Sequence, residues 1–216
     1  MELMKNIAIY GAGGYGKEVA CLINLINEVK REWNFIGFFD DGLPIGHQNE
    51  YGIVIGGITE LNNYPHNFSI VMAIAQPTTL KSVVKKFTNP LIEFPNIIAP
   101  DILYLDEGTV SMGHGNIIGF KSGISCNVRI GNFNRLNGNI NLGHDVIIGS
   151  FNMFNPSTRI SGEVSIGNCN FFGISSIVLQ QKKIGNNTTI GANSVIIRNT
   201  KDNTTYIGNP AFEFKY

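Results

Sequence analysis

The apolar positions of the chain follow two different periods, one in each half. Between residue 5 and about residue 95, short apolar runs alternate with stretches of helical character. The runs are "NIAIY", "FIGFFD", "YGIVIGG" and "SIVMAIA", and the helical stretches are "KEVACLINLINEVKRE" and "TTLKSVVKKF". This alternation predicts a small parallel α/β domain, which we place at residues 1–97.

From Met112 onward the period changes to six. Fifteen consecutive sixth positions are apolar: Met112, Ile118, Ile124, Ile130, Leu136, Leu142, Ile148, Phe154, Ile160, Ile166, Phe172, Val178, Ile184, Ile190 and Ile196. A helix repeats its apolar residues every three or four positions and a strand every two, so six fits neither. It is typical of a triangular solenoid with one face per six residues and one coil per eighteen. We therefore predict a β-helix domain over residues 98–216, with a C-terminal cap and about five coils.

A glycine-rich turn follows the first apolar run. In "IAIYGAGGYGKEVA", residues 7–20, Gly11, Gly13 and Gly16 have the spacing G-x-G-x-x-G. Glycines at this spacing let a strand-to-helix turn close and let backbone amides approach a phosphate. Asp40, at the end of the next run, lies about where a ribose-binding acid would be. A turn that only connects a strand to a helix is the alternative interpretation.

The length of the α/β half excludes a dehydrogenase. It ends within about a hundred residues, which leaves too few strands for a two-halved dinucleotide fold. Half of such a fold suits one phosphorylated or nucleotide-linked small molecule.

Charge and cysteine content exclude several other classes. Sixteen basic and sixteen acidic residues cancel, and no basic stripe with interleaved aromatics is present, so nucleic acid is not expected as a partner. No stretch approaches the length of a membrane span, and the N-terminus has no secretory pattern, so we expect a cytoplasmic protein. The three cysteines are far apart and predict neither disulfides nor a cysteine zinc site.

Several motifs together resemble one family. They are "GAGGYGKEVA", "FFDD", "NLGHDVIIGSF", "SGEVSIGNCNFFGISSIVL" and "YIGNPA". The chain is similar to the hexapeptide-repeat sugar acyltransferases of the sialic-acid O-acetyltransferase and nucleotide-aminosugar N-acetyltransferase type. The resemblance implies a left-handed parallel β-helix and a homotrimer with active sites between neighbouring subunits. It also implies acetyl-CoA as co-substrate and a nucleotide sugar as acceptor.

The resemblance also implies roles for individual residues. His144 matches the general base and Asp145 the acid that supports it. Residues that match the acetyl-CoA groove are Met153, Gly162, Ile174 and Ala192. Residues that match the nucleotide-sugar site are Gly11, Gly13, Gly14, Tyr15, Asp40 and Asp41. The spacings agree with the solenoid, because His144 and Gly162 are eighteen residues apart, as are Ile174 and Ala192, so each pair stacks on adjacent coils.

The chain departs from the family pattern at three positions. Tyr15 replaces a common His of the glycine turn, Met153 replaces a second His near the coenzyme, and Ala99 replaces the His of an "I-H-P" sequence.

The resemblance implies acetyl transfer from acetyl-CoA to a nucleotide-linked amino sugar in surface glycan synthesis. O-acetylation of a sugar hydroxyl, as on sialic acid, and a non-catalytic trimeric binding protein are the alternatives. For His144 the plain alternative is a solvated solenoid corner, and His114 in "MGHG" serves as its comparison. A zinc enzyme of related fold needs three ligands, whereas the repeat holds only these two histidines, so we expect no metal.

Overall fold

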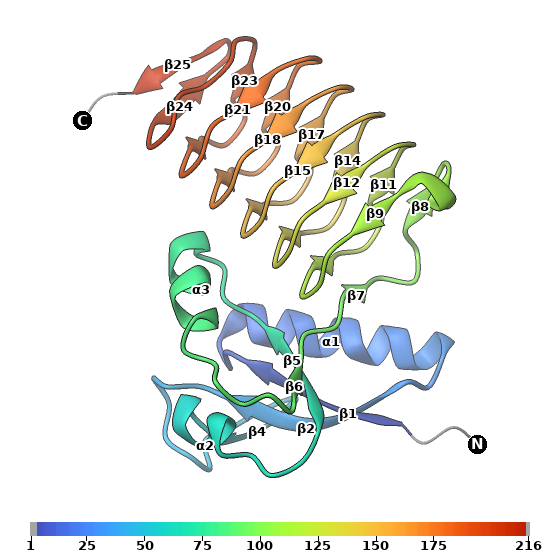
Figure 1. Cartoon of the computed structure of the whole chain (residues 1–216), viewed down its shortest axis with the longest axis vertical. Helices are drawn as coiled ribbons and strands as arrows, with labels where there is room; N and C mark the ends of the chain where they lie inside the picture. The colour runs from blue at the N-terminus through green and yellow to red at the C-terminus, as the bar shows by residue number, and fades with distance from the viewer. Residues whose placement is uncertain (1–3, 215–216) are drawn as a thin grey trace.

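The computed structural model describes residues 4–214. An α/β domain lies at one end, and a solenoid of short strands rises above it, with the C-terminal hairpin at the far end (Figure 1). No helix within the described residues is long and apolar enough to cross a membrane. The fold class predicted from the two periods is confirmed.

The N-terminal domain is built on a six-stranded sheet with the order β3-β4-β2-β1-β5-β6. The sheet is parallel except for the β3–β4 pair. Its strands are β1 (Lys5–Tyr10), β2 (Trp33–Phe39), β3 (Gln48–Asn49), β4 (Gly52–Gly56), β5 (Phe68–Met72) and β6 (Ile92–Glu93), and its helices are α1 (Gly14–Val29), α2 (Ile58–Asn62) and α3 (Pro77–Val84). All four predicted apolar runs form strands. Because β1 has β2 on one side and β5 on the other, the strand order reverses between β1 and β5, where α/β folds usually bind ligands.

The solenoid has three parallel faces. The first face contains β7 (Ile97–Ile98), β10 (Ile117–Ile118), β13 (Arg135–Leu136), β16 (Met153–Phe154), β19 (Phe171–Phe172), β22 (Thr189–Ile190), β24 (Thr205–Gly208) and the antiparallel edge strand β25 (Ala211–Phe214). The second contains β8 (Leu103–Tyr104), β11 (Gly123–Ile124), β14 (Asn141–Leu142), β17 (Arg159–Ile160), β20 (Ile177–Val178) and β23 (Val195–Ile196). The third contains β9 (Ser111–Met112), β12 (Arg129–Ile130), β15 (Ile147–Ile148), β18 (Ser165–Ile166) and β21 (Lys183–Ile184).

The sixth-position residues form the core of the solenoid. Each of the fifteen ends a strand and points inward, and all but Met112 are fully buried. The glycine that often follows is needed for close stacking of coils. A Cβ on Gly149, for example, would lie 2.5 Å from the carbonyl oxygen of Gly167 on the next coil. The repeat therefore encodes both the core and the spacing of the coils.

The corners are held by left-handed residues at every sixth position from Lys121 to Asn193. None of them is glycine, and a left-handed conformation costs such a residue roughly 1–2 kcal/mol. From Phe133 onward, the backbone N–H of the left-handed residue donates to a carbonyl on the preceding coil, as Asp145 does to Cys126 (3.0 Å) and Glu163 to His144 (2.8 Å). This regular ladder fixes the direction of corner side chains.

The solenoid begins one coil before the strict repeat. Ile98 and Tyr104 keep the six-residue spacing, but two extra residues separate Tyr104 from Met112, and a short 3-10 helix (Glu107–Thr109) accommodates them. Strand β7 spans the boundary predicted between residues 97 and 98, which stays a prediction. Ile97 packs into the core of the N-terminal domain, and Ile98 packs against that of the solenoid.

The two domains share packed side chains at two places. Ile97 and Ile117 of the first face join the cluster formed by α1. Phe133, at a solenoid corner, joins the cluster that contains β5 and α3 and stacks on Phe151 with ring centres 5.2 Å apart. The carboxyl end of the N-terminal sheet is thereby held against the first face of the solenoid.

Candidate active site

His144 and Asp145 lie at the corner between the second and third faces. His144 Nδ1 and Asp145 Oδ2 are 2.8 Å apart, and the His144 side chain is 55% exposed. With Nδ1 engaged by a carboxylate, the imidazole presents Nε2 as its other nitrogen. The arrangement suits proton transfer, because the carboxylate orients the ring and stabilises its protonated form.

Asp145 is held in place by Asn127, which lies one coil earlier. Asn127 Nδ2 donates to Asp145 Oδ1 (3.1 Å), and the Asn127 N–H donates to Thr109 Oγ1 (2.9 Å). The hydrogen bonds from His144 and then from Asn127 keep the pKa of Asp145 below its usual range, so the carboxylate is ionised at neutral pH. The sequence analysis missed Asn127, although its position eighteen residues before Asp145 would have indicated it.

Gly162 lies directly against the His144 ring. A Cβ on Gly162 would collide with Nε2 and lie 2.7 Å from Cε1. The stacking predicted for this pair of residues is therefore present. The absence of a side chain at position 162 gives the ring its room, and any role of Gly162 in binding a coenzyme stays a prediction.

Replacement of Asp145 by Asn should lower turnover by about tenfold, with acetyl-CoA affinity unchanged. The reason is that the carboxylate fixes the orientation and tautomer of the His144 ring, which an amide at the same place does not do equally well. Steady-state kinetics with a separate acetyl-CoA Kd measure this. Wild-type turnover in a folded variant would contradict a role for Asp145 in positioning the base.

A cavity of about 390 Å³ borders Asp145. It is lined by Thr109, Asn127, Arg129, Asp145 and Ile147. The corner therefore offers both a polar recess and an exposed imidazole.

Ile174 and Ala192 lie at a different corner, between the first and second faces. They stack on adjacent coils, as the Asn193 N–H donates to the Ile174 carbonyl (2.9 Å) and a Cβ on Gly173 would meet the backbone of Ala192. Ile174 is 50% exposed. Within one chain this corner is separate from the His144 corner, as predicted from the spacing.

Met153 differs from the other residues predicted for the coenzyme groove. It points outward from β16 on the first face but is only 4% exposed, because its own chain covers it. Contact between Met153 and a coenzyme stays a prediction, and the single chain does not expose this side chain for it.

His114 lies at the third kind of corner, between the third and first faces. Its ring packs edge-on to Phe133 with centroids 5.1 Å apart, and its N–H donates to Asn132 Oδ1 (3.0 Å). The His114 ring therefore packs against an aromatic side chain, whereas the His144 ring contacts a carboxylate. Among residues 4–214 no three His, Cys, Asp or Glu side chains form a group that could hold a metal ion.

The four glycines of the turn are of two kinds: a side chain on Gly11 or Gly16 would collide with neighbouring backbone, whereas one on Gly13 or Gly14 would not. Gly11 has φ +107°, and Gly16 approaches the Gly11 carbonyl too closely for a Cβ. A Cβ on Gly13 or Gly14 would meet no heavy atom within 4 Å, and Gly13 has φ −73°. Gly13 is therefore not left-handed, and the backbone of Gly13 and Gly14 at the N-terminus of α1 faces open space.

The two predicted aspartates are bound to the backbone around this turn. Asp40 accepts hydrogen bonds from the N–H groups of Ala12 and Gly42, both at 2.8 Å. Asp41 accepts from the Tyr10 hydroxyl and from the N–H of Ile58, at the start of α2. Burial and then this bond to Asp41 raise the pKa of Tyr10. Both carboxylates thus shape the site, and direct contact with a nucleotide stays a prediction.

A second cavity, of about 540 Å³, lies between α1 and the solenoid. Apolar side chains from both domains line most of it, including Tyr15, Leu22, Phe120 and Pro156, and its polar residues include Glu18, Asn137 and Asn155. It extends from Tyr15, just after the glycine turn, to Asn155 and Pro156, which lie one coil before Ile174 in the same column of corners.

One family model matches the N-terminal domain. Residues 6–87 match the family model of the PglD N-terminal domain. No curated protein sequence matches the chain.

Solved structures resemble the chain over its whole length. The acetyltransferase domain of PglB from Neisseria gonorrhoeae, solved with acetyl coenzyme A, is 25% identical, with 98% of this chain and 100% of that chain covered and a TM-score of 0.86. WeeI from Acinetobacter baumannii is 24% identical, with 96% and 99% covered and a TM-score of 0.85. PerB from Caulobacter crescentus, solved with CoA and GDP-perosamine, is 20% identical, with 99% of both chains covered and a TM-score of 0.84. The resemblance to PglD-type sugar acyltransferases and the left-handed β-helix that it implies are confirmed.

Proposed function

We propose that the chain is an acetyl-CoA-dependent N-acetyltransferase acting on a nucleotide-linked amino sugar in surface glycan synthesis. The observation that carries this is the His144–Asp145 pair, which presents Nε2 above Gly162 on a solenoid corner. The PglB domain and PerB are supporting cases, since they have the same fold and were solved with acetyl coenzyme A and with CoA plus a nucleotide sugar.

In this mechanism the amine nitrogen of the acceptor attacks the thioester carbonyl carbon. His144 Nε2 takes a proton from the attacking nitrogen, the carbon–sulfur bond breaks, and the imidazolium gives the proton to the departing sulfur, which leaves as the free thiol of CoA. Asp145 holds the ring and stabilises the imidazolium, while binding both substrates together makes the reaction effectively intramolecular. Such a base typically contributes roughly 100- to 10,000-fold in rate.

The proposed acetyl-CoA groove requires a second subunit. The corner with Ile174 and Ala192 and the corner with His144 are separate within one chain, and Ile174 is an exposed apolar side chain suited to the apolar part of the coenzyme. In a homotrimer the two corners of neighbouring subunits meet and complete the site. The acceptor then binds at the glycine turn of the N-terminal domain.

The activity is tested by release of free thiol from acetyl-CoA in the presence of a panel of nucleotide amino sugars. Thiol release that depends on one member of the panel supports the enzyme. Binding of a nucleotide sugar without any thiol release would indicate the non-catalytic alternative, and release only with a sugar hydroxyl would indicate O-acetylation.

Replacement of Gly13 by Val should raise the acceptor KM by tenfold or more, with acetyl-CoA affinity unchanged. Its Cβ would enter open space, so the fold tolerates it, whereas the side chain would occupy the room above the α1 N-terminus. Acceptor KM and acetyl-CoA Kd measure the two effects separately. Loss of acetyl-CoA binding alone would show that the two sites are assigned the wrong way round.

A further inference from the structure

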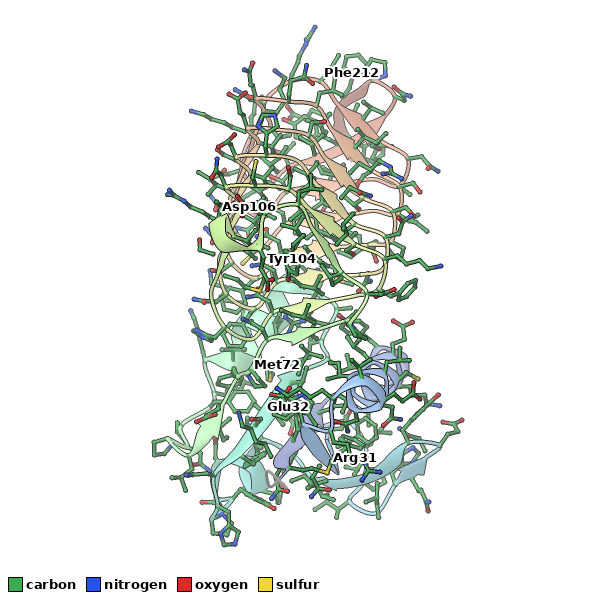
Figure 2. All side chains as sticks on the ribbon, turned by 90° about the vertical axis from the view of Figure 1, so that its right-hand side faces the viewer. Arg31, Glu32, Met72, Tyr104, Asp106 and Phe212 are labelled. Carbon is green, nitrogen blue, oxygen red and sulfur yellow. The ribbon has the colours of Figure 1, made fainter. Side chains whose placement is uncertain are left out.

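Arg135 is a fully buried cation between the two domains. It points outward from β13 on the first face, yet it is only 1% exposed, and its register neighbours Ile117 and Met153 are apolar. One terminal nitrogen donates to the carbonyl of Met72 and the other to that of Gly115 (3.4 Å). Figure 2 shows Met72 where the N-terminal domain meets the solenoid.

The guanidinium has no negative partner within residues 4–214. It forms no ion pair with a described carboxylate, and its Nε–H has no hydrogen-bond acceptor there. Burial lowers the pKa of Arg135 to about 10, which leaves it charged at neutral pH. An unpaired buried charge is strongly destabilising, so a charge of this kind is normally compensated by an anion.

Tyr15 supplies a second unpaired donor beside Arg135. The Tyr15 ring lines the 540 Å³ cavity, whereas its hydroxyl is buried and has no hydrogen-bond partner in the described part of the chain. Burial raises the pKa of Tyr15 to about 12, against the opposing effect of the positive charge of Arg135. Ile117, the register neighbour of Arg135, lines the same cavity as Tyr15, so the two donors without acceptors lie in one region of the domain boundary.

The same place is the switch point of the sheet. Met72 ends β5, and the next residue, Ala73, donates its N–H to Tyr10 at the end of β1 (2.8 Å) and lies against Gly11. Tyr15 is in the first turn of α1, which follows the open glycines. Arg135 donates to the carbonyl of Met72 at the end of β5, and the positive end of the α1 dipole follows the end of β1, so both lie at the carboxyl end of the sheet.

We propose that Arg135 and Tyr15 bind the diphosphate of the nucleotide-linked acceptor, with Arg135 reaching it from the acetyltransferase domain. The inference rests on the proposed function and deepens it. A phosphate oxygen accepts from Arg135 Nε and from the Tyr15 hydroxyl, and its charge compensates the guanidinium. Because the Tyr15 ring lies at the cavity wall, its displacement opens the path to Arg135. The acceptor site is then built from both domains and selects sugars that carry a diphosphate.

The test measures the affinity of the full-length protein for UDP, GDP and dTDP by isothermal titration calorimetry. Arg135→Met should weaken binding of the preferred nucleoside diphosphate by about 10- to 100-fold, and Tyr15→Phe should weaken it by about fivefold, as expected for lost hydrogen bonds to a charged group. Arg159→Met is the matched control, because Arg159 also points outward from a two-residue strand but is exposed on the second face. Its affinity should equal that of the wild type.

Thermal unfolding without ligand separates binding from structure. Tyr15→Phe removes only a hydroxyl that lacks a partner, so it should melt at or above the wild-type temperature, and Arg135→Met should not melt lower either, since it removes an uncompensated buried charge. If Arg135→Met fails to fold, the nucleotide affinity of Tyr15→Phe tests the inference instead. If folded Tyr15→Phe or Arg135→Met binds the nucleotide with wild-type affinity, the roles of these two residues are overturned and the proposed acceptor site is not. If the wild-type protein binds none of the three nucleotides, the proposed acceptor site is overturned as well.

Discussion

Replacement of His144 by Ala is expected to lower turnover by about 100- to 10,000-fold, with acetyl-CoA binding almost unchanged. The side chain is exposed at a corner and belongs to no core cluster, so the fold should survive its removal. A base acts mainly in the transition state, and its loss therefore appears in kcat rather than in substrate affinity. Steady-state kinetics with a direct measurement of acetyl-CoA Kd separate the two quantities.

His114→Ala is the matched control for this experiment. It removes the other histidine of the solenoid, which packs on Phe133 at a different corner and has no carboxylate after it. Its turnover should stay near that of the wild type. Near-normal turnover in His144→Ala together with an inactive His114→Ala would place the active site at the other corner.

Gly162→Ala is expected to lower kcat by about 100-fold through displacement of the His144 ring. The added methyl would collide with Nε2, and a misplacement of about 1 Å costs roughly that factor in rate. The backbone of the corner need not change, so melting should stay close to that of the wild type. Gly108→Ala at the same kind of corner is the control, because its Cβ would lie 3.6 Å from Asp106, an ordinary contact.

A double-mutant cycle separates this effect from a role of Gly162 in coenzyme binding. In the His144→Ala background, Gly162→Ala should cost almost nothing further in kcat, because the ring that it displaces is already absent. Additive losses with a raised acetyl-CoA Kd would instead assign Gly162 to the coenzyme groove.

The period of six was sufficient to predict the solenoid because each repeat encodes a local rule. One inward apolar residue and one tight corner recur every six positions, so the register of every strand follows from the sequence. The stacking of His144 on Gly162 and of Ile174 on Ala192 followed from the eighteen-residue coil in the same way. The first coil was not visible, since the insertion before Met112 breaks the spacing.

Other features depend on contacts between distant segments and could not be predicted. The glycine spacing does not distinguish the structural Gly11 and Gly16 from the open Gly13 and Gly14, because the difference lies in what surrounds each Cα. The burial of Arg135 depends on how the N-terminal domain packs against the first face. Its position did carry a signal, however, since a charged residue interrupts a column of apolar outward residues at Ile117 and Met153.

The most direct test of the central claim is the product formed from acetyl-CoA and a nucleotide-linked amino sugar. The purified product is analysed by mass spectrometry and NMR, which locate the acetyl group. The account predicts one acetyl group on the amino nitrogen of the intact nucleotide sugar, formed by the wild type and almost absent with His144→Ala. An acetyl ester on a hydroxyl, acetylation of the free sugar alone, or equal product from the two proteins would contradict it.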